Sequence, residues 1–465
     1  MKTILPFLMI GMLVLSGLGA GALSFDKVST IASSATQDSF DMVIIAPKKF
    51  AADLQPLVDH KNNHGVKTFV KTTEDIMDQY EGRDDAEKVK YFIKDALETH
   101  DITYVLLVGG RVGQFSKWAV PVRYSNLDDG ANYTSFLSDL YFADIYKGNT
   151  TEFEDWDSNG NGIFAEWNAE GKDVLDLMPD VIVGRLPCRN RFEVKAIVQK
   201  IISYESTPAG AWFNRMVCIG GDSYAGIGDP FPYEGEATCN VSASYMTGFD
   251  IVKLYTSTGA LTGPEEVLEE LNQGCGFVIT RGKGGTDKMR TLLPDGTQIV
   301  PLTNKVVRQL KNKDKYPVVV LGECIHAKFD VCLFNVFKLL KGDPNIFTDF
   351  RWNDCITECI AWLFVKQANS GAIAMISNTN ICYGDYGDKN HDGIPDDAQR
   401  YGGYLATDVF KQYGQNGEHV LGKIYVNTLK DYLENFPAKT QIIDCKSMQE
   451  WTLFGDPSLM IGGYQ

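Results

Sequence analysis

The chain has 465 residues, 44% of them hydrophobic and 22% charged, which is the composition of a folded soluble protein rather than of a disordered or fibrous one. Lys and Arg total 44 against 60 Asp and Glu, so the formal net charge is −16. Because nucleic acids and anionic membranes attract clustered cations, this acidic balance argues against both as partners. The length allows about two or three domains.

The N-terminus has the pattern of a secretory signal peptide. Lys2 is followed by an apolar run from Ile4 to Leu18 and then by small residues. We therefore expect residues 1–22 to be a signal peptide and the mature chain to be secreted, extracellular or at the cell surface. The alternative is a retained membrane anchor, because apolar stretches of this borderline length sometimes span a bilayer. No later apolar run is long enough to predict a membrane span once the signal is removed.

After the signal, residues 23–40 are rich in Ser and Thr and predict a flexible lead. Residues 41–187 then alternate short apolar runs with amphipathic segments, interrupted by a loop-rich acidic stretch at residues 126–180. Such alternation is typical of parallel strands covered by helices on both faces, so we predict an N-terminal α/β subdomain. Its predicted strands are residues 42–45, 66–70, 104–108 and 181–183, and its predicted helices are about residues 49–63 and 85–99.

The same alternation continues over residues 188–465, which predicts a C-terminal α/β subdomain. The predicted fold class is therefore α/β, with two adjacent doubly wound, mainly parallel sheets that divide near residues 188–210. In open sheets of this kind, ligands bind at the carboxyl ends of the strands. The predicted elements are a helix at residues 191–204 and strands at residues 216–220, 251–255, 277–280, 318–321 and 372–376.

The ten cysteines are scattered from Cys188 to Cys445 and are compatible with disulfides in an oxidising compartment. No C-x-x-C pair occurs, so neither a zinc ribbon nor a thioredoxin-like redox site is indicated. The pairing of the cysteines stays open at this point.

Two acidic loops match calcium-binding patterns. Residues 155–166 fit D-x-D-x-[DN]-G-x5-E, in which alternate oxygen donors converge on a hard cation, Gly permits a sharp turn and a late Glu binds with two oxygens. Residues 388–397 are a weaker copy. We expect a structural calcium ion at each loop, the alternative being metal-free acidic turns. The predicted ligands are Asp155, Asp157, Asn159, Asn161 and Glu166 in the first loop and Asp388, Asn390, Asp392 and Asp396 in the second.

Two predicted strand ends in the C-terminal half are candidates for a catalytic or ligand-binding site. Cys324 follows the apolar strand at residues 318–321 closely, at an edge where this architecture places catalytic groups. A buried inert thiol is the alternative, since free Cys often behaves as a small hydrophobe. The glycine-rich residues 281–286 follow another predicted strand, and glycines there allow a close approach of the backbone to a ligand.

From about Asp41 to the C-terminus, the chain resembles the gingipain family of cysteine peptidases, which are relatives of caspases and legumains. No single segment decides the resemblance, but the order and spacing of the segments are specific. They are residues 42–47, 106–110, 139–144 and 179–187, the strand that leads to Cys324, residues 371–377 with Tyr383-Gly384, and residues 453–459.

The resemblance implies a site. In the family, a strand that ends in Gly-His-Gly supplies the base, and a later strand that ends in a small residue and Cys supplies the nucleophile. The nucleophile position falls on Cys324, whereas the histidine position falls on Lys283, between Gly282 and Gly284. The resemblance also implies an oxyanion hole made by the backbone N–H groups of Cys324 and Gly284.

A lysine at the histidine position alters the expected chemistry. An ammonium group lowers the pKa of a neighbouring thiol. As a proton shuttle, however, a lysine needs its pKa to fall from about 10.4 to about 7, and a neighbouring thiolate opposes that fall. Lys283 is thus expected to be a good electrostatic partner and a poor proton shuttle.

Two neighbours of Cys324 are candidates for compensating roles. His326 is a surrogate base if the chain stays extended, because the two side chains then lie on one side about 7 Å apart. If a helix starts at Cys324, the two side chains diverge. The alternative for His326 is an ordinary loop or core histidine. Glu323 either orients a neighbour, lines a specificity pocket or is a simple polar strand end.

The sequence therefore predicts a secreted gingipain-like cysteine-type peptidase homologue that cleaves peptides or proteins through a Cys324 thioester. The alternative is a catalytically inactive homologue that serves as an extracellular module for binding a peptide or protein. Both hypotheses require Cys324 and Lys283 to share one crevice.

Overall fold

The computed structural model describes residues 39–464, except residues 115–116, 132, 224–231 and 342–352. The predicted signal peptide lies outside the described residues, as does all but the end of the predicted lead. Within the described part of the chain, no helix is long and apolar enough to cross a membrane.

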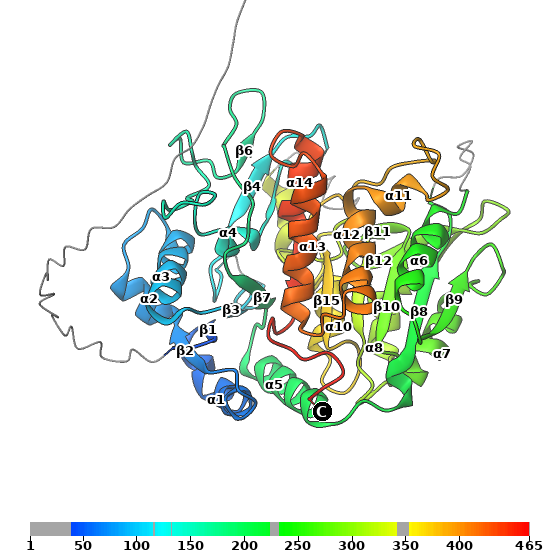
Figure 1. Ribbon diagram of the computed structural model, residues 1–465, viewed down its shortest axis with the longest axis horizontal. Coiled ribbons are helices and arrows are strands. Elements are labelled where there is room, and N and C mark those ends of the chain that lie inside the picture. The colour runs from blue at the N-terminus through cyan, green and yellow to red at the C-terminus, as the bar shows by residue number, and fades with distance from the viewer. Residues whose placement is uncertain (1–38, 115–116, 132, 224–231, 342–352, 465) are drawn as a thin grey trace, which may run out of the picture. The chain divides into compact units, whose positions relative to one another are not determined.

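The core is a single ten-stranded sheet to which both predicted subdomains contribute (Figure 1). Its strands are β1 (Met42–Ala46), β2 (Thr68–Thr72), β3 (Tyr104–Val108), β7 (Ile182–Leu186), β8 (Arg215–Gly220), β9 (Asp250–Tyr255), β10 (Phe277–Arg281), β14 (Val318–Leu321), β15 (Ala374–Asn378) and β16 (Trp451–Phe454). Their order is β2-β1-β3-β7-β16-β15-β14-β10-β8-β9, and every neighbouring pair is parallel except β15–β16. The predicted α/β class with mainly parallel strands is confirmed.

The structure differs from the prediction of two adjacent sheets, because β16 joins the two sets of strands. Leu453 of β16 pairs antiparallel with Ile376 of β15, and Phe454 pairs parallel with Arg185 of β7. In two separate sheets, β7 and β15 would be edge strands with unpaired backbone groups. β16 lies between them and pairs with each. The two parallel blocks therefore run in opposite directions within one sheet.

Burial along the strands follows their place in the sheet. All residues of β1, β3, β10 and β14 are buried, because helices cover both faces and the strands are continuous apolar runs. The edge strands β2 and β9 are only partly buried. Arg185 is a charged exception on β7: its guanidinium is fully buried and lies 2.6 Å from the Asp139 carboxylate.

The predicted helices at residues 49–63, 85–99 and 191–204 are confirmed as α1 (Lys48–Asn63), α3 (Asp85–His100) and α5 (Arg191–Ser206). Asp84 and Asn190 cap α3 and α5 by accepting backbone N–H groups of the first turn. In Figure 1, α12 and α13 cross in front of the central strands. The other α-helices are α2 (Thr73–Gln79), α4 (Leu140–Ala143), α6 (Glu234–Tyr245), α7 (Pro264–Gln273), α8 (Asn304–Gln309), α10 (Ile360–Lys366), α11 (Asp396–Gln399), α12 (Tyr401–Phe410), α13 (Leu421–Asn435) and α14 (Ile442–Glu450). The elements η1 (Ala211–Asn214) and η2 (Leu333–Lys341) are 3₁₀-helices, and η3 (Lys411–Gln415) is a π-helix.

Two small three-stranded sheets accompany the core. One has the order β11-β12-β13 and begins two residues after β10, so that it carries the glycine-rich segment beyond the sheet edge. The other has the order β5-β4-β6. Their strands are β11 (Lys283–Gly285), β12 (Lys288–Leu292), β13 (Gln298–Thr303), β4 (Tyr124–Leu127), β5 (Ser135–Leu137) and β6 (Glu166–Trp167).

Candidate active site

A pocket of about 530 Å³ lies at the carboxyl ends of β8, β10, β14 and β15. These four strands are parallel, so their carboxyl ends meet at one edge of the sheet, which is where open α/β sheets bind ligands. Lys283 and Gly284 line the pocket after β10, and Glu323 and Cys324 line it after β14. The two residues that the sequence predicts to share a crevice, Cys324 and Lys283, both line this pocket.

Gly284 packs directly against the nucleophile segment. A Cβ atom on Gly284 would lie 2.7 Å from the backbone nitrogen of Cys324 and still closer to its carbonyl oxygen, so only glycine fits there. The backbone segments that carry the two predicted oxyanion donors are thus in contact.

The Cys324 thiol is partly exposed on the pocket wall and lies 3.3 Å from the carbonyl oxygen of Cys382, to which it donates. Burial, with a smaller contribution from the nearby Glu450 carboxyl, raises the pKa of this thiol to about 11. Arg281 and Lys446 act in the opposite direction but do not offset the burial. Cys324 is therefore a neutral thiol at physiological pH, and a reaction at this sulfur needs a proton acceptor.

Lys283 is the first residue of β11 and pairs with Arg290 in the antiparallel β11–β12 ladder. Its side chain is exposed at the pocket wall. Lys283 is therefore a solvent-exposed member of the pocket wall.

His326 lies outside the pocket wall, contrary to the predicted position of a surrogate base. Ile325 has a left-handed φ of 51°, so the chain continues from Cys324 neither as a strand nor as a helix. His326 is fully buried, with Nε2 3.0 Å from the Lys288 carbonyl oxygen and Nδ1 3.3 Å from Glu323 Oε2. The polar contacts that the structure gives the two ring nitrogens are therefore with Lys288 and Glu323, and neither contact pairs His326 with the Cys324 sulfur.

Glu323 lines the pocket but is almost fully buried, and only one of its two carboxylate oxygens has a hydrogen-bond partner. Thr280 donates a hydrogen bond of 2.8 Å to Oε2, while buried Oε1 has no hydrogen-bond partner. Of the predicted site residues, the structure thus brings together Cys324, Lys283, Gly284 and Glu323, and leaves His326 behind Glu323.

The family model for peptidase family C25 matches residues 35–462. The chain belongs to peptidase family C25.

Curated relatives of this C25 chain are the gingipains of Porphyromonas gingivalis. Gingipain R2 is 22% identical over 428 residues, which cover 90% of this chain and 46% of the relative. Gingipain R1 is also 22% identical over 428 residues, which cover 34% of that protein. The chain spans less than half the length of these curated relatives.

Solved structures share the fold of the C25 chain. The crystal structure of the Arg specific cysteine proteinase gingipain R aligns with a TM-score of 0.60 at 19% identity, covering 91% of this chain and 78% of that one. The complex of the pro- and mature domains of RgpB from Porphyromonas gingivalis aligns with a TM-score of 0.59 at 20% identity, covering 90% and 79%. The resemblance to the gingipain family is confirmed.

Two acidic side chains in the pocket, Asp397 and Glu234, were not predicted as site residues from the sequence. Arg281 donates to both carboxylate oxygens of Asp397, with Nε 2.8 Å from Oδ2. Glu234, the first residue of α6, also lines the pocket and accepts a hydrogen bond of 2.9 Å from the Ser223 backbone N–H. The only sequence signal for Glu234 is an acidic residue at a helix start, which many helices share.

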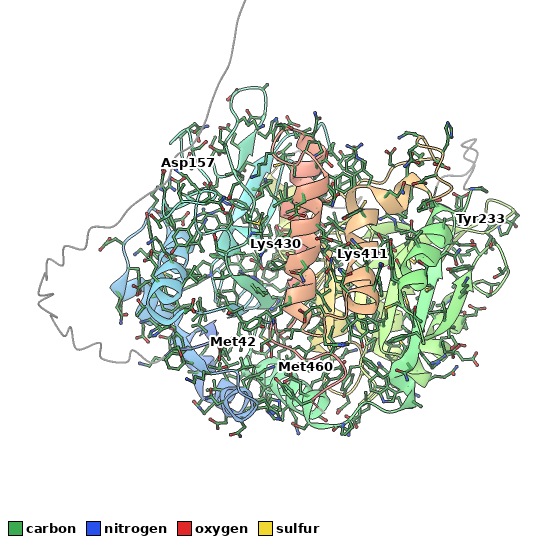
Figure 2. All side chains as sticks on the ribbon, viewed as in Figure 1. Met42, Asp157, Tyr233, Lys411, Lys430 and Met460 are labelled. Atoms are coloured by element: carbon green, nitrogen blue, oxygen red, sulfur yellow. The ribbon has the colours of Figure 1, made fainter. Side chains whose placement is uncertain are left out.

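The two acidic loops of the C25 chain have the same hydrogen-bond pattern. Asp157 accepts from the N–H groups four and five residues later, and Asp388 does the same. In the first loop, Arg83 lies 3.0 Å from Asp155 and 2.6 Å from Asp157. Figure 2 labels Asp157 among the loops beside α3.

The remaining predicted calcium ligands form contacts within their loops. The side-chain oxygens of both loops suit a hard cation, but no cluster of three or more His, Cys, Asp or Glu able to hold a metal ion is found in the described part of the chain. Calcium stays a prediction. Glu166 accepts from the side-chain amides of Asn159 and Asn161, Asp396 accepts from the Lys389 N–H, and Asn390 donates to Asp392.

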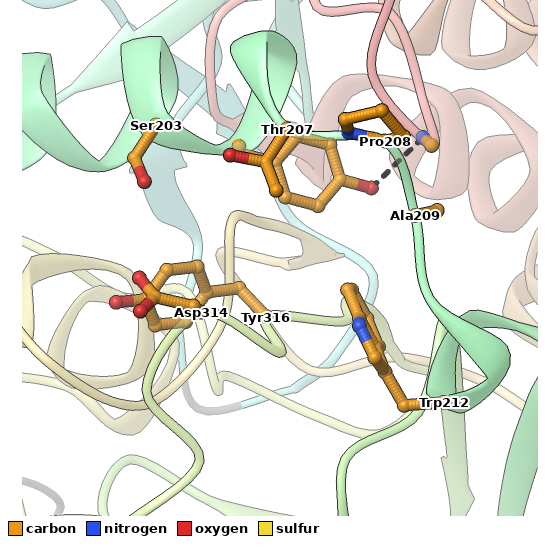
Figure 3. Close-up of a pocket in the computed structure, with 9 residues that line it drawn as sticks. Ser203, Thr207, Pro208, Ala209, Trp212, Asp314 and Tyr316 are labelled. Carbon is orange, nitrogen blue, oxygen red and sulfur yellow. Dashed lines mark hydrogen bonds between the residues drawn. The ribbon is translucent and has the colours of Figure 1, made fainter.

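A second, smaller pocket lies between the end of α5 and the loop that precedes β14 (Figure 3). Trp212 and Tyr316 form part of its wall, and the Tyr204 hydroxyl accepts a hydrogen bond of 3.0 Å from the Gly462 N–H. None of the described residues that line it is Cys, His or Lys, and its volume is about 30 Å³. It has neither the room nor the groups for peptide chemistry.

The structure contains no disulfide among the described residues, which include all ten cysteines. Cys324 and Cys382 both line the site pocket, so two thiols are present there. Any thiol-directed reagent must therefore be assigned to one of the two by substitution.

Proposed function

We propose that the chain is a secreted cysteine-type endopeptidase that cleaves peptides or proteins through a thioester on Cys324. Membership of family C25 supports a peptide or protein substrate. The observation that carries the proposal is the contact between Gly284 and Cys324 inside a pocket at the carboxyl ends of the strands. This contact brings the nucleophile and the proposed oxyanion donors into one place.

In this proposal, Cys324 Sγ attacks the carbonyl carbon of the scissile peptide bond. The backbone N–H groups of Cys324 and Gly284 bind the oxyanion as it forms, an interaction worth about 2.7–4 kcal/mol per donor in other hydrolases. The Lys283 ammonium group stabilises negative charge on the sulfur. General acid–base help, worth about 10²–10⁴ in rate, must come from another group.

The second candidate is a non-catalytic module that binds peptides or proteins in the same pocket. The pKa of about 11 for Cys324 favours it, because almost no thiolate is present at neutral pH. It is also favoured because none of the described residues that line the pocket is a histidine.

A labelling and turnover experiment separates the two candidates. The chain without residues 1–22 is treated with a Cys-directed acyl-type peptide probe and, separately, with a pooled peptide library. Labelling and turnover that Cys324→Ala abolishes and Cys382→Ala preserves support the peptidase. A folded sample that binds peptides but shows neither labelling nor turnover supports the binding module.

Replacement of Lys283 tests whether the pocket can support catalysis once an imidazole is supplied. Lys283→His restores an imidazole at the position where the family resemblance expects one, and we expect peptide turnover to rise by about 10²-fold or more. The measurement is kcat/KM on a peptide that the library identifies. No gain in a folded Lys283→His protein contradicts a competent catalytic scaffold.

We also propose that calcium stabilises the two acidic loops, and that the chain acts outside the cytoplasm. The common hydrogen-bond pattern of the loops and their oxygen donors support the first point. The apolar N-terminal run after Lys2 supports the second.

A further inference from the structure

The proposed peptidase reaction needs a group that takes the thiol proton and delivers it to the leaving nitrogen. None of the described residues on the pocket wall is a histidine, and His326 is sealed behind Glu323. A lysine at the position of Lys283 is a poor proton shuttle when its neighbour becomes a thiolate. The pocket must therefore be searched for another group that gains and loses a proton near neutral pH.

Glu234 occupies the same pocket as Cys324 and Lys283. Its side chain is nearly buried, with 6% of its surface exposed, and the Ser223 N–H holds Oε1 at 2.9 Å. Figure 2 labels Tyr233, which directly precedes Glu234 at the start of α6. The Glu234 carboxyl group is therefore held in place by burial and by the hydrogen bond from the Ser223 backbone, and it does not rotate freely in solvent.

Two glycine contacts connect Glu234 with the nucleophile. A Cβ on Gly235 would lie 2.8 Å from the Gly221 oxygen and still closer to the Arg281 oxygen, so α6 begins directly against the ends of β8 and β10. Three residues after Arg281, Gly284 packs on Cys324 in the same manner. The start of α6 and the Cys324 segment are thus both packed closely against the chain that leaves β10.

The charges around Glu234 favour its neutral form. Burial raises its pKa to about 7; the hydrogen bond from Ser223 acts against this, and negative charge on Asp397 and Asp222 adds to it. Arg281 faces the same pocket, but Asp397 holds its guanidinium with two hydrogen bonds. The other charged groups on the pocket wall are Lys283, Arg290 and Glu323.

We propose that Glu234 is the general base and general acid of the Cys324 site, in the role that an imidazole has in related peptidases. This inference rests on the proposed peptidase function and names the residue that completes it. A carboxyl group that is half ionised near neutral pH serves as acid and as base in other hydrolases, where burial also sets its pKa.

The proton transfers balance without any additional reactant. The Glu234 carboxylate takes the Sγ proton, directly or through one water molecule, as sulfur bonds to the peptide carbonyl carbon. The carboxylic acid then gives this proton to the leaving nitrogen as the C–N bond breaks, leaving a thioester and a free amine. Water next attacks the thioester while Glu234 takes one of its protons, and that proton returns to Sγ as the C–S bond breaks. One water is consumed per peptide bond.

The test compares an amide with a p-nitrophenyl ester of the same peptide in the Glu234→Gln variant. An amide needs Glu234 both for sulfur attack and for nitrogen departure, whereas p-nitrophenolate leaves without a proton. We expect kcat/KM for the amide to fall by about 10²–10⁴, and acylation of Cys324 by the ester to fall at least tenfold less. Ester acylation in the variant should recover as the pH approaches 11, where the thiol ionises by itself.

The pH profile is the second readout. Wild-type kcat/KM for the amide should rise through about pH 7 as Glu234 becomes a carboxylate, and Glu234→Gln should lack this rise. Glu236→Gln is the matched control, because Glu236 is equally buried on α6 but binds Ser257 and does not line the pocket. Glu234→Asp keeps a carboxyl group and should keep the rise.

The outcomes distinguish a failure of the proposed role of Glu234 from a failure of the proposed peptidase function. Equal losses for amide and ester, unchanged turnover in Glu234→Gln, or a Glu234→Asp profile without the rise overturns the role of Glu234. A selective amide loss in Glu323→Gln instead of Glu234→Gln also overturns it. If folded wild-type protein is neither acylated at Cys324 nor able to cleave the amide, the peptidase function itself fails.

Discussion

At residue scale, Gly284 is the point where the ends of two strands meet. The backbone atoms of Cys324 occupy the space that a side chain at position 284 would need. We expect Gly284→Ala to cost about 1–3 kcal/mol of stability, typical of overpacking, and to lower Cys324 labelling by at least tenfold as the segments separate. The measurements are chemical denaturation and the rate of labelling by the acyl-type probe.

Gly285 offers the matched control for this prediction. Gly285 lies on the same strand β11 as Gly284. A Cβ on Gly285 would lie 3.5 Å from Lys288 of β12, which is an ordinary van der Waals distance. Gly285→Ala should therefore leave the labelling rate nearly unchanged. Equal effects of the two substitutions would mean that general strain in β11, and not the contact with Cys324, controls the site.

Strand ends alone made Cys324 only a candidate, since an inert buried thiol was the alternative. The resemblance to the gingipain family assigned the nucleophile position to Cys324 and the histidine position to Lys283, and parallel strands bring the two strand ends together. For His326 the sequence left a surrogate base and an ordinary core histidine open, because nothing in the sequence indicates the left-handed turn at Ile325. Glu234 was missed because its significance comes from burial among segments far apart in the chain, to which no local pattern points.

At the scale of elements, α5 is fastened to the connection between α10 and β15 by one buried lysine. The Lys200 ammonium group donates to the carbonyl oxygens of Val365, Ser370 and Ala372 at 2.8, 3.1 and 3.2 Å. Burial, without a carboxylate among these partners, lowers the pKa of Lys200 to about 7. The contact therefore depends on pH.

The direction of this dependence follows from proton counts. Between about pH 7 and pH 10.4, unfolded Lys200 keeps its proton while folded Lys200 has lost it, so its contribution to stability rises with pH. The unfolding free energy of wild type relative to Lys200→Met should rise in this window by up to about 1.4 kcal/mol per pH unit. Urea denaturation at several pH values measures it. Exposed Lys195 on the same helix is the control, and an equal slope for Lys195→Met would refute the assignment.

The acidic loops give a second prediction at this scale. If calcium binds only the folded chain, it raises the unfolding free energy by about 2.7 kcal/mol when its concentration is 100 times the dissociation constant. Asp388→Ala and Asp157→Ala should each remove part of the calcium-dependent rise in Tm, measured against EDTA. In the first loop, Arg83 must leave Asp155 and Asp157 before an ion binds, so Arg83→Gln should increase its affinity. An unchanged Tm with calcium contradicts both sites.

Strands that are buried on both faces were predicted correctly, because such strands are continuous apolar runs in the sequence. The runs at residues 42–45 and 318–321 are uninterrupted and apolar, and they became β1 and β14. β16 has only four residues, including Thr452, so its pattern is too short to separate a strand from a loop. The strands β4, β5 and β6 are shorter still or polar, and their pairing is set by contacts distant in sequence.

At the scale of the whole described fold, β16 decides whether the chain has one sheet or two. It is contributed by the C-terminal end of the chain, yet it pairs with β7 from the N-terminal half. We therefore expect folding of the two parallel blocks to be coupled through β16. Hydrogen exchange should report this coupling, because β3 and β10, on opposite sides of β16, should open with one common free energy.

Leu453→Pro tests the coupling, since proline removes a backbone donor and strains the ladder in the middle of a sheet. We expect a loss of at least about 3 kcal/mol and separate opening free energies for β3 and β10. Leu453→Ala is the control, because it removes a side chain that is 2% exposed while keeping the backbone N–H. It should destabilise the protein by about 2–5 kcal/mol yet leave the two blocks opening together. If β3 and β10 still exchange with equal free energies in Leu453→Pro, contacts between helices, and not β16, hold the two blocks together.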